Sequence, residues 1–350
     1  MIRRTAIGLA LLCLLVLLLS AAFAARYLVF WSPSEEIVFE SGDVLLAGTL
    51  FKPRSDGRFP AAIVLHGAGP DERGGVGYRL NAKALLRRGF AVLLYDKRGA
   101  GASGGDFRTA GYPDFIADAK AAVRFLVARE DIDGRAIGLF GNSESGWFTP
   151  EIAVDNPAVA FIVNRVGSPL SLIETITWEA RNDYRADGVA EADLDALLGL
   201  TRRIWDYLRT AARDPAYARG PARAALQREI DGARASIADA EQLFDATLPP
   251  YDPEAYAGYL DLSYDPRPYL QRLEVPLLYV FAEDDINVPT AQSVAFLESL
   301  RDESGKDITI QVHPDIGHSM QSWRYLLSGA YPPGYLDFVS DWAARQIELP

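Results

Sequence analysis

Short runs of apolar residues alternate with amphipathic segments along most of the chain. The apolar runs lie at 61–65, 90–95, 137–140, 161–163, 277–281 and 308–312. Apolar residues recur at helical spacing over 78–88, 113–129, 291–300 and 335–347. Buried strands that alternate with helices are typical of βαβ units. The pattern therefore predicts an α/β fold with a mostly parallel sheet flanked by helices. Antiparallel strands at 37–39 and 45–51 are expected to precede it.

The alternation stops between residues 171 and 264. This stretch has helical spacing, for example from Leu194 to Leu200, and prolines interrupt it, but it contains no apolar strand-like run. We therefore expect a helical cap insertion at 171–264 within a core made of 35–170 and 265–350.

The N-terminal segment has the pattern of an export signal. Arg3 and Arg4 precede an apolar run at 6–25, and Ala22-Phe23-Ala24 fits a signal-peptidase site. The run is also long enough to cross a bilayer as a helix. Residues 1–25 are thus expected to be a signal peptide or a membrane anchor. The protein would be exported to the periplasm or another extracytoplasmic space, secreted or anchored, with membrane contact only through this segment if it is uncleaved.

Composition narrows the classes of partner. The formal net charge is -12 and the sequence pI is about 4.8, which disfavours binding to nucleic acid. The single cysteine, Cys13, excludes a disulfide framework and a thiolate metal site. The three histidines lack metal-ligand spacing, so no metal site is expected.

A candidate nucleophile follows the apolar run at 137–140. The string GNSESG, residues 141–146, places Ser143 between that strand and a predicted helix. A sharp strand-to-helix turn exposes a serine hydroxyl above the carboxyl ends of the strands. Such a turn needs small residues around the serine, and Ser145 stands where glycine is usual.

Two later loops supply a candidate base and acid. A base belongs on an accessible loop near the carboxyl ends of the strands, which favours His318 over His66 and His313. The carboxylates after the strand at 277–281 are candidates to orient it, with Asp285 preferred and Asp284 as the alternative.

Backbone amides are the natural donors for a developing oxyanion. The residue after the nucleophile, Glu144, is one candidate. The other is Ala68, in the loop His66-Gly67-Ala68-Gly69 after an early strand. This interpretation makes His66 a residue that orders the loop.

Three of these segments resemble α/β-hydrolase carboxylesterases, and are similar to prolyl-oligopeptidase-like and serine-aminopeptidase hydrolases. They are LHGAGP at 65–70, YDKRGAGAS at 95–103 and GNSESGW at 141–147. The order Ser, Asp, His along the chain is that of this fold. The turn from Ala282 to Asp285 resembles the acid turn of the family, with alanine where glycine is usual. The resemblance extends over 37–347 except the insertion, and it implies a Ser-Asp-His hydrolase that needs no cofactor.

The expected reaction is hydrolysis of small carboxylic esters with short to medium acyl chains, through an acyl-enzyme intermediate. A serine peptidase, aminopeptidase or thioesterase on the same fold is the alternative, and Glu174 or Glu179 in the cap are candidates to hold a peptide amine. Five cap aromatics are available to line an apolar pocket, with the core of the cap as the alternative place for many of them: Trp178, Trp205, Tyr207, Phe244 and Tyr256. The string GAGASG at 99–104 matches a dinucleotide-binding pattern but does not open a helix, which disfavours nucleotide binding.

Overall fold

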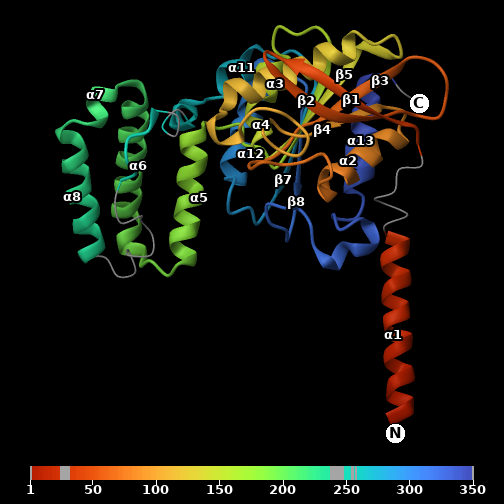
Figure 1. The fold of residues 1–350 in the computed structure, drawn as a ribbon, viewed down its shortest axis with the longest axis horizontal. Helices are drawn as coiled ribbons and strands as arrows, with labels where there is room; N and C mark the ends of the chain where they lie inside the picture. The colour runs from red at the N-terminus through yellow and green to blue at the C-terminus, as the bar shows by residue number, and fades with distance from the viewer. Residues whose placement is uncertain (1, 24–31, 237–247, 254–255, 257, 349–350) are drawn as a thin grey trace.

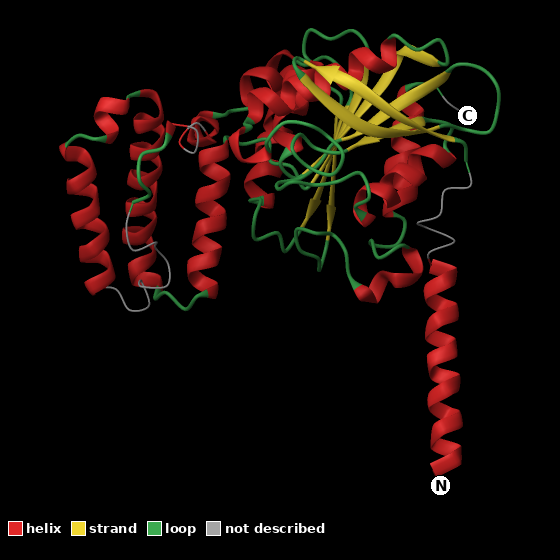
Figure 2. Ribbon diagram, viewed as in Figure 1, coloured by secondary structure: helices red, strands yellow, loops and turns green. Residues whose placement is uncertain are grey.

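The computed structural model describes residues 2–23, 32–236, 248–253, 256 and 258–348, with the side chains of the N-terminal helix described over 11–22. Its centre is one eight-stranded sheet (Figures 1 and 2). The strand order is β1-β2-β4-β3-β5-β6-β7-β8. The strands are β1 (Ser34–Ser41), β2 (Val44–Phe51), β3 (Phe59–Val64), β4 (Ala91–Tyr95), β5 (Ile132–Asn142), β6 (Val159–Arg165), β7 (Leu277–Ala282) and β8 (Ile308–His313).

The direction of the strands agrees with the predicted α/β class. Strand β1 pairs antiparallel with β2, and β2 pairs antiparallel with β4. The other five pairs are all parallel. The carboxyl ends of strands β3 to β8 therefore meet at one edge, and the loops that follow β5, β7 and β8 carry the three candidate catalytic side chains.

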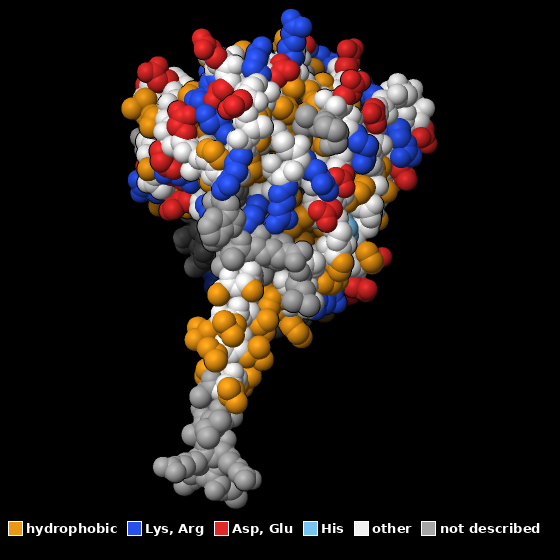
Figure 3. Space-filling model, turned by 90° about the vertical axis from the view of Figure 1, so that its right-hand side faces the viewer, with side chains coloured by type: hydrophobic (Ala, Val, Ile, Leu, Met, Phe, Trp, Pro, Cys, Tyr) orange, Lys and Arg blue, Asp and Glu red, His pale blue; other side chains and the backbone are white. Residues whose placement is uncertain are grey.

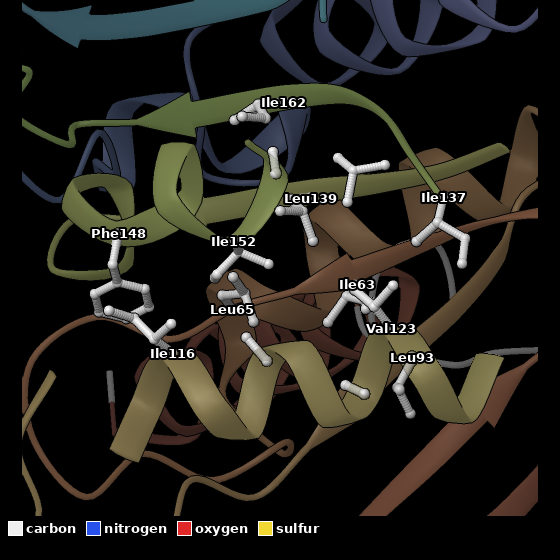
Figure 4. Close-up of a cluster of buried hydrophobic side chains, with 14 of the residues drawn as sticks. Ile63, Leu65, Leu93, Ile116, Val123, Ile137, Leu139, Phe148, Ile152 and Ile162 are labelled. Carbon is white, nitrogen blue, oxygen red and sulfur yellow. The ribbon is translucent and has the colours of Figure 1, made fainter. Parts of the chain in front are cut away.

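Helices cover both faces of the sheet. On one face lie α3 (Tyr112–Val127), α4 (Ser145–Ala153), α11 (Arg267–Arg272) and α12 (Thr290–Ser304), and on the other α2 (Val76–Arg87) and α13 (Tyr335–Gln346). Consecutive strand residues face opposite sides, so Ile63 packs in one core cluster and Val64 in the other. Figure 4 shows the first cluster, where Ile116 and Val123 of α3 pack against the sheet. A strand with both faces covered must be apolar at successive positions, which explains the continuous runs in the sequence.

The segment between β6 and β7 is helical in its described residues. It contains α5 (Leu172–Ala186), α6 (Glu191–Arg213), α7 (Pro215–Ala218), α8 (Pro221–Ser236) and the short η3 (Gly258–Ser263). Figure 1 shows α5, α6 and α8 side by side, away from the sheet. Helices α6, α7 and α8 share a cluster that includes Tyr207 and Leu226, and a smaller cluster joins Tyr184 of α5 to α6. The segment thus has an interior of its own.

Helix α1 (Ile2–Phe23) extends away from the body of the molecule (Figure 1). Its described side chains are exposed, and Figure 3 shows apolar side chains around its surface. Among the residues that the structure describes, no helix combines the length and hydropathy that a bilayer crossing requires. The described residues also form two short 3₁₀ helices, η2 (Phe107–Thr109) and η4 (Trp323–Ser328).

Candidate active site

Ser143 stands at the turn between β5 and α4, as the sequence predicts. Its φ of 49° lies in the left-handed region, which is unusual for a residue other than glycine and marks local strain. The turn is held by its neighbours. Ser145 is fully buried, accepts a hydrogen bond from the Asn142 amide at 2.7 Å, and donates one to the Asn142 carbonyl at 3.1 Å. The serine that replaces the usual glycine therefore closes the turn with its hydroxyl.

The close approach that requires glycine falls one residue later. A Cβ atom on Gly146 would lie 2.6 Å from the Cα atom of Gly167, in the segment that follows β6. A Cβ atom on Gly141 would lie 2.6 Å from Asn164 Oδ1. The two glycines allow the start of α4 to pack against the end of β6 and its loop, which brings Ser143 to the edge of the sheet.

The structure brings Ser143, His318 and Asp285 together from three loops. Ser143 Oγ lies 2.8 Å from His318 Nε2. His318 Nδ1 lies 2.8 Å from Asp285 Oδ2 and 3.0 Å from Asp285 Oδ1. The hydroxyl, the imidazole and the carboxylate thus form a continuous hydrogen-bonded chain, in which the carboxylate selects the tautomer with hydrogen on Nδ1.

Asp285, and not Asp284, contacts the imidazole. The Asp285 side chain is fully buried, and its Oδ1 also accepts the backbone amides of Asn287 and Val288, each at 2.9 Å. Asp284 is exposed, and its backbone amide bonds to the Ile316 carbonyl at 3.0 Å. In this turn the side chain of Asp284 is therefore exposed to solvent, whereas that of the next residue, Asp285, is buried.

The other two histidines are structural. His66 is buried, with its ring edge-on to Tyr78 and Tyr95. Burial, assisted by the charge of Lys97, lowers the pKa of His66 to about 3, so the imidazole stays neutral. His313 ends β8 and packs against Tyr335, and burial lowers the pKa of its imidazole as well. Neither ring is within hydrogen-bond distance of Ser143 in the structure.

The two residues whose amides are expected to bind an oxyanion both border the cavity in front of Ser143. Ala68 and Glu144 are among the residues that line it. No acceptor within the described part of the chain is hydrogen-bonded to either backbone amide. Orphaned amides that face a cavity are available to a ligand oxygen.

A buried ion pair behind this cavity escaped the sequence reasoning. The Lys97 ammonium, 5% exposed, contacts the Glu144 carboxylate and donates to the Gly67 carbonyl at 3.0 Å. It also lies 4.2 Å from the ring centre of Phe115. Burial raises the pKa of Glu144, while the ammonium of Lys97 opposes that shift. One signal was present in the sequence: a lysine two residues after a strand buried on both faces needs a carboxylate partner.

The cavity has a volume of about 510 Å³ and lies between the sheet edge and the first helix of the cap segment. Leu172, Ile176 and Glu179 of α5 line it at positions that share one helix face. The side-chain amide of Asn287 donates to the Glu179 carboxylate, and burial raises the pKa of Glu179. Trp178 and Asn182 donate to the carbonyls of Asp285 and Ile286, so α5 is attached directly to the turn that carries the acid.

None of the cap aromatics that the structure describes lines the cavity, and two of them belong to the interior of the cap instead. Tyr207 and Tyr256 are buried in the cluster shared by α6 to α8, and neither Trp178 nor Trp205 is among the residues that line the cavity. Phe244 lies outside the described residues. The aromatic part of the lining comes instead from the core: Tyr78, Tyr112 and Trp147. Glu174 caps the start of α5 and pairs with Arg267, away from the cavity.

The glycine-rich string at 99–104 forms a loop around Asp96. The Asp96 carboxylate accepts the amides of Arg73 and Ala102, and a Cβ atom on Gly101 would lie 2.5 Å from Asp96 Oδ2. The glycines therefore serve the close packing of this loop. Among the described residues, no group of three or more His, Cys, Asp or Glu side chains is placed to hold a metal ion.

Comparison with known proteins identifies the family of the chain. The family model described as "X-Pro dipeptidyl-peptidase (S15 family)" matches residues 41–318, which include Ser143, Asp285 and His318. The chain belongs to this S15 family. It is accordingly a hydrolase of the serine type with the α/β-hydrolase fold, and the family resemblance noted from the three motif segments is confirmed.

Relatives of this S15-family chain include esterases. Esterase EstD of Thermotoga maritima is 24% identical over 324 residues, which cover 88% of this chain and 68% of the relative. Among solved structures, an esterase of Pyrococcus furiosus matches with a TM-score of 0.58 at 18% identity, covering 90% of this chain and 91% of the other. The α/β hydrolase GrgF of Penicillium sp. sh18 matches with a TM-score of 0.57 at 19% identity, covering 90% and 99%. The likeness to the two solved structures shows the fold.

Proposed function

We propose that the protein hydrolyses carboxylic esters of short to medium acyl chain, with Ser143 as nucleophile, His318 as base and Asp285 as the acid that orients it. The observation that carries the proposal is the hydrogen-bonded chain from Ser143 Oγ to His318 Nε2, at 2.8 Å, and from His318 Nδ1 to Asp285, at 2.8 Å. A nucleophile, a base and an orienting group within hydrogen-bond reach of one another are what acyl transfer requires.

The proposed mechanism has two steps. Ser143 Oγ attacks the ester carbonyl while His318 Nε2 takes its proton, and the negative oxygen is stabilised by the amides of Ala68 and Glu144. His318 then protonates the departing alkoxide, which leaves an acyl-enzyme. Water attacks the acyl carbon, again with His318 as base, and the acid is released as Ser143 regains its proton.

Two observations favour a small ester as substrate. The cavity of about 510 Å³ lies within the ordinary range for small-molecule sites, and α5 presents Leu172 and Ile176 to it. Esterase EstD is a relative over most of the chain. An acyl chain of a few carbons fits a cavity of that size.

The test combines active-site labelling with a substrate panel. A fluorophosphonate probe should label the wild type at Ser143, and Ser143→Ala should lose the label and several orders of magnitude in kcat while it remains folded. On p-nitrophenyl esters from acetate to palmitate, kcat/KM should be highest for short chains. Labelling of a different serine, or an active Ser143→Ala variant, would exclude this assignment.

A peptidase is the second candidate, and Glu179 favours it. Its carboxylate lines the cavity and is hydrogen-bonded to a neutral amide, without a cationic partner among the described side chains. A half-buried carboxylate without a cation can bind a substrate amine. The two candidates are separated by aminoacyl and prolyl anilides: turnover of an anilide equal to or better than that of the best ester would assign the protein as a peptidase.

We also propose that residues 1–25 direct export of the protein, because Arg3 and Arg4 precede the apolar run at 6–25. Residues 1–40 fused to a reporter that is active only outside the cytoplasm should give activity, and an Arg3→Glu/Arg4→Glu variant of the fusion should give less. A stable but inactive reporter would contradict export.

A further inference from the structure

Three motif segments meet at a single buried ammonium group. Lys97 lies in the loop after β4, Gly67 in the loop after β3, and Glu144 directly after the nucleophile. Lys97 Nζ donates to the Gly67 carbonyl at 3.0 Å and contacts the Glu144 carboxylate. The ammonium is thus bonded to both loops that carry the candidate oxyanion amides.

We propose that Lys97 is a positioning residue that holds the amides of Ala68 and Glu144 in place for the oxyanion. This inference rests on the proposed function, because it concerns the same acyl-transfer site. Lys97 is not among the residues that line the cavity, so it acts through the two loops and does not touch the substrate.

The geometry of the peptide bond links Lys97 to the amide of Ala68. In a planar trans peptide the C=O of one residue and the N–H of the next point in opposite directions. The bond from Lys97 to the Gly67 carbonyl therefore sets the direction of the Ala68 N–H. The Gly67 amide in turn donates to the Tyr78 hydroxyl at 3.0 Å, which fixes the preceding peptide plane as well.

The surroundings of the ammonium explain why it stays in one position. Its side chain is 5% exposed, and that of Glu144 is 15% exposed. The ring centres of Phe115 and Phe107 lie 4.2 Å and 5.1 Å from Nζ. A buried cation with a carboxylate, a carbonyl and two rings around it has little freedom to move. Because the carboxylate of Glu144 neutralises the ammonium, the pair contributes position rather than net charge to the oxyanion site.

The adjacent residue offers a matched control. Arg98 also forms a buried ion pair, with Asp118 of α3 at 2.6 Å, and a second one with Asp114 of the same helix at 3.2 Å. Within the described part of the chain it is hydrogen-bonded to neither oxyanion segment. Arg98→Met therefore removes a buried ion pair from the same loop without releasing Gly67 or Glu144. Lys97→Met removes the bond to both and retains a side chain of similar length.

The experiment compares these two variants of the full chain with p-nitrophenyl butyrate and an alkyl trifluoromethyl ketone, which forms a tetrahedral adduct with a nucleophilic serine. Lys97→Met should lower kcat by about 10²–10³-fold, the effect of losing one oxyanion donor, with KM within about threefold. The inhibition constant of the ketone should rise by a similar factor. Arg98→Met should keep kcat within about threefold of the wild type. Circular dichroism shows at which temperatures each variant is folded.

A second variant covers the case in which Lys97→Met leaves Glu144 buried without a partner and the protein unfolds. Lys97→Met/Glu144→Gln also removes the unpaired carboxylate of Glu144. It should show the same loss of kcat and of ketone affinity. Either variant, folded and with kcat within about threefold of Arg98→Met, overturns the positioning role. A loss of kcat with unchanged ketone affinity overturns it as well. A wild type that neither hydrolyses the ester nor is labelled at Ser143 overturns the proposed function, and this inference with it.

Discussion

Replacing Asp285 by asparagine tests the candidate site most sharply, because the structure determines how the amide must orient. Asp285 Oδ1 accepts the backbone amides of Asn287 and Val288, each at 2.9 Å. In Asp285→Asn those two donors can be satisfied only by the amide oxygen. The NH₂ group is then placed where Oδ2 stands, 2.8 Å from His318 Nδ1.

A donor at that position selects the wrong imidazole tautomer. Nδ1 then faces the NH₂ group at 2.8 Å and the amide oxygen at 3.0 Å. The shorter contact favours the tautomer in which Nδ1 accepts from the NH₂ group and the hydrogen resides on Nε2, which faces Ser143 Oγ at 2.8 Å and can no longer take its proton. The corresponding change in serine proteases lowers kcat by about 10⁴-fold. This corresponds to about 5.5 kcal/mol of transition-state stabilisation. Because the amide oxygen keeps both backbone donors, the free energy of unfolding should change by no more than about 1 kcal/mol.

The assay is kcat for p-nitrophenyl butyrate, with urea unfolding of the same preparations. Asp284→Asn is the matched control, since Asp284 is exposed and should retain kcat within about threefold. An Asp285→Asn variant that keeps more than one tenth of wild-type kcat would refute the tautomer argument. A large loss in Asp284→Asn alone would place the acid one residue earlier.

Two further predictions concern stability. Ser145→Ala should lower the free energy of unfolding by about 1–3 kcal/mol, measured in urea, because the buried Asn142 amide loses its acceptor at 2.7 Å; an unchanged midpoint would contradict this. Burial raises the pKa of Asp261 to about 6, so its charged form costs stability above that pH, and the cost disappears as pH falls towards the ordinary value of 3.8. Asp261→Asn should therefore be more stable than the wild type by about 1 kcal/mol at pH 8, a figure discounted for partial exposure, and equal to it near pH 4. A stability difference that does not vary with pH would show that the carboxyl does not titrate in this way.

The strands could be predicted because a sheet covered on both faces leaves a simple pattern. Ile63 and Val64 face opposite sides and are both buried, so the run at 61–65 is apolar throughout. The start of β5 was missed. Its first residues, Ile132 to Arg135, form no apolar run, and their strand geometry depends on a partner in β3, which no local pattern reveals.

The residues of the candidate triad could be predicted from the sequence for a related reason. In a parallel sheet the loops after neighbouring strands meet at one edge, so Ser143, Asp285 and His318 could be placed together from strand ends alone. The Lys97–Glu144 pair could not be placed in this way, since it depends on side-chain directions in two loops 47 residues apart. Which cap aromatics line a pocket and which form the core could not be decided from the sequence, because helix packing directs Tyr207 and Tyr256 into the interior of the cap segment.

The position of α5 has a consequence for how the substrate preference of this protein can evolve by substitution. The helix face with Leu172, Ile176 and Glu179 borders the cavity that is proposed to bind the substrate, whereas α6 to α8 keep a separate interior. Substitutions on that single face can alter which substrates fit while the distant helices continue to fold around their own cluster. New substrate preferences are therefore accessible in few mutational steps, and a library confined to these three positions is the natural starting point for directed evolution of the protein.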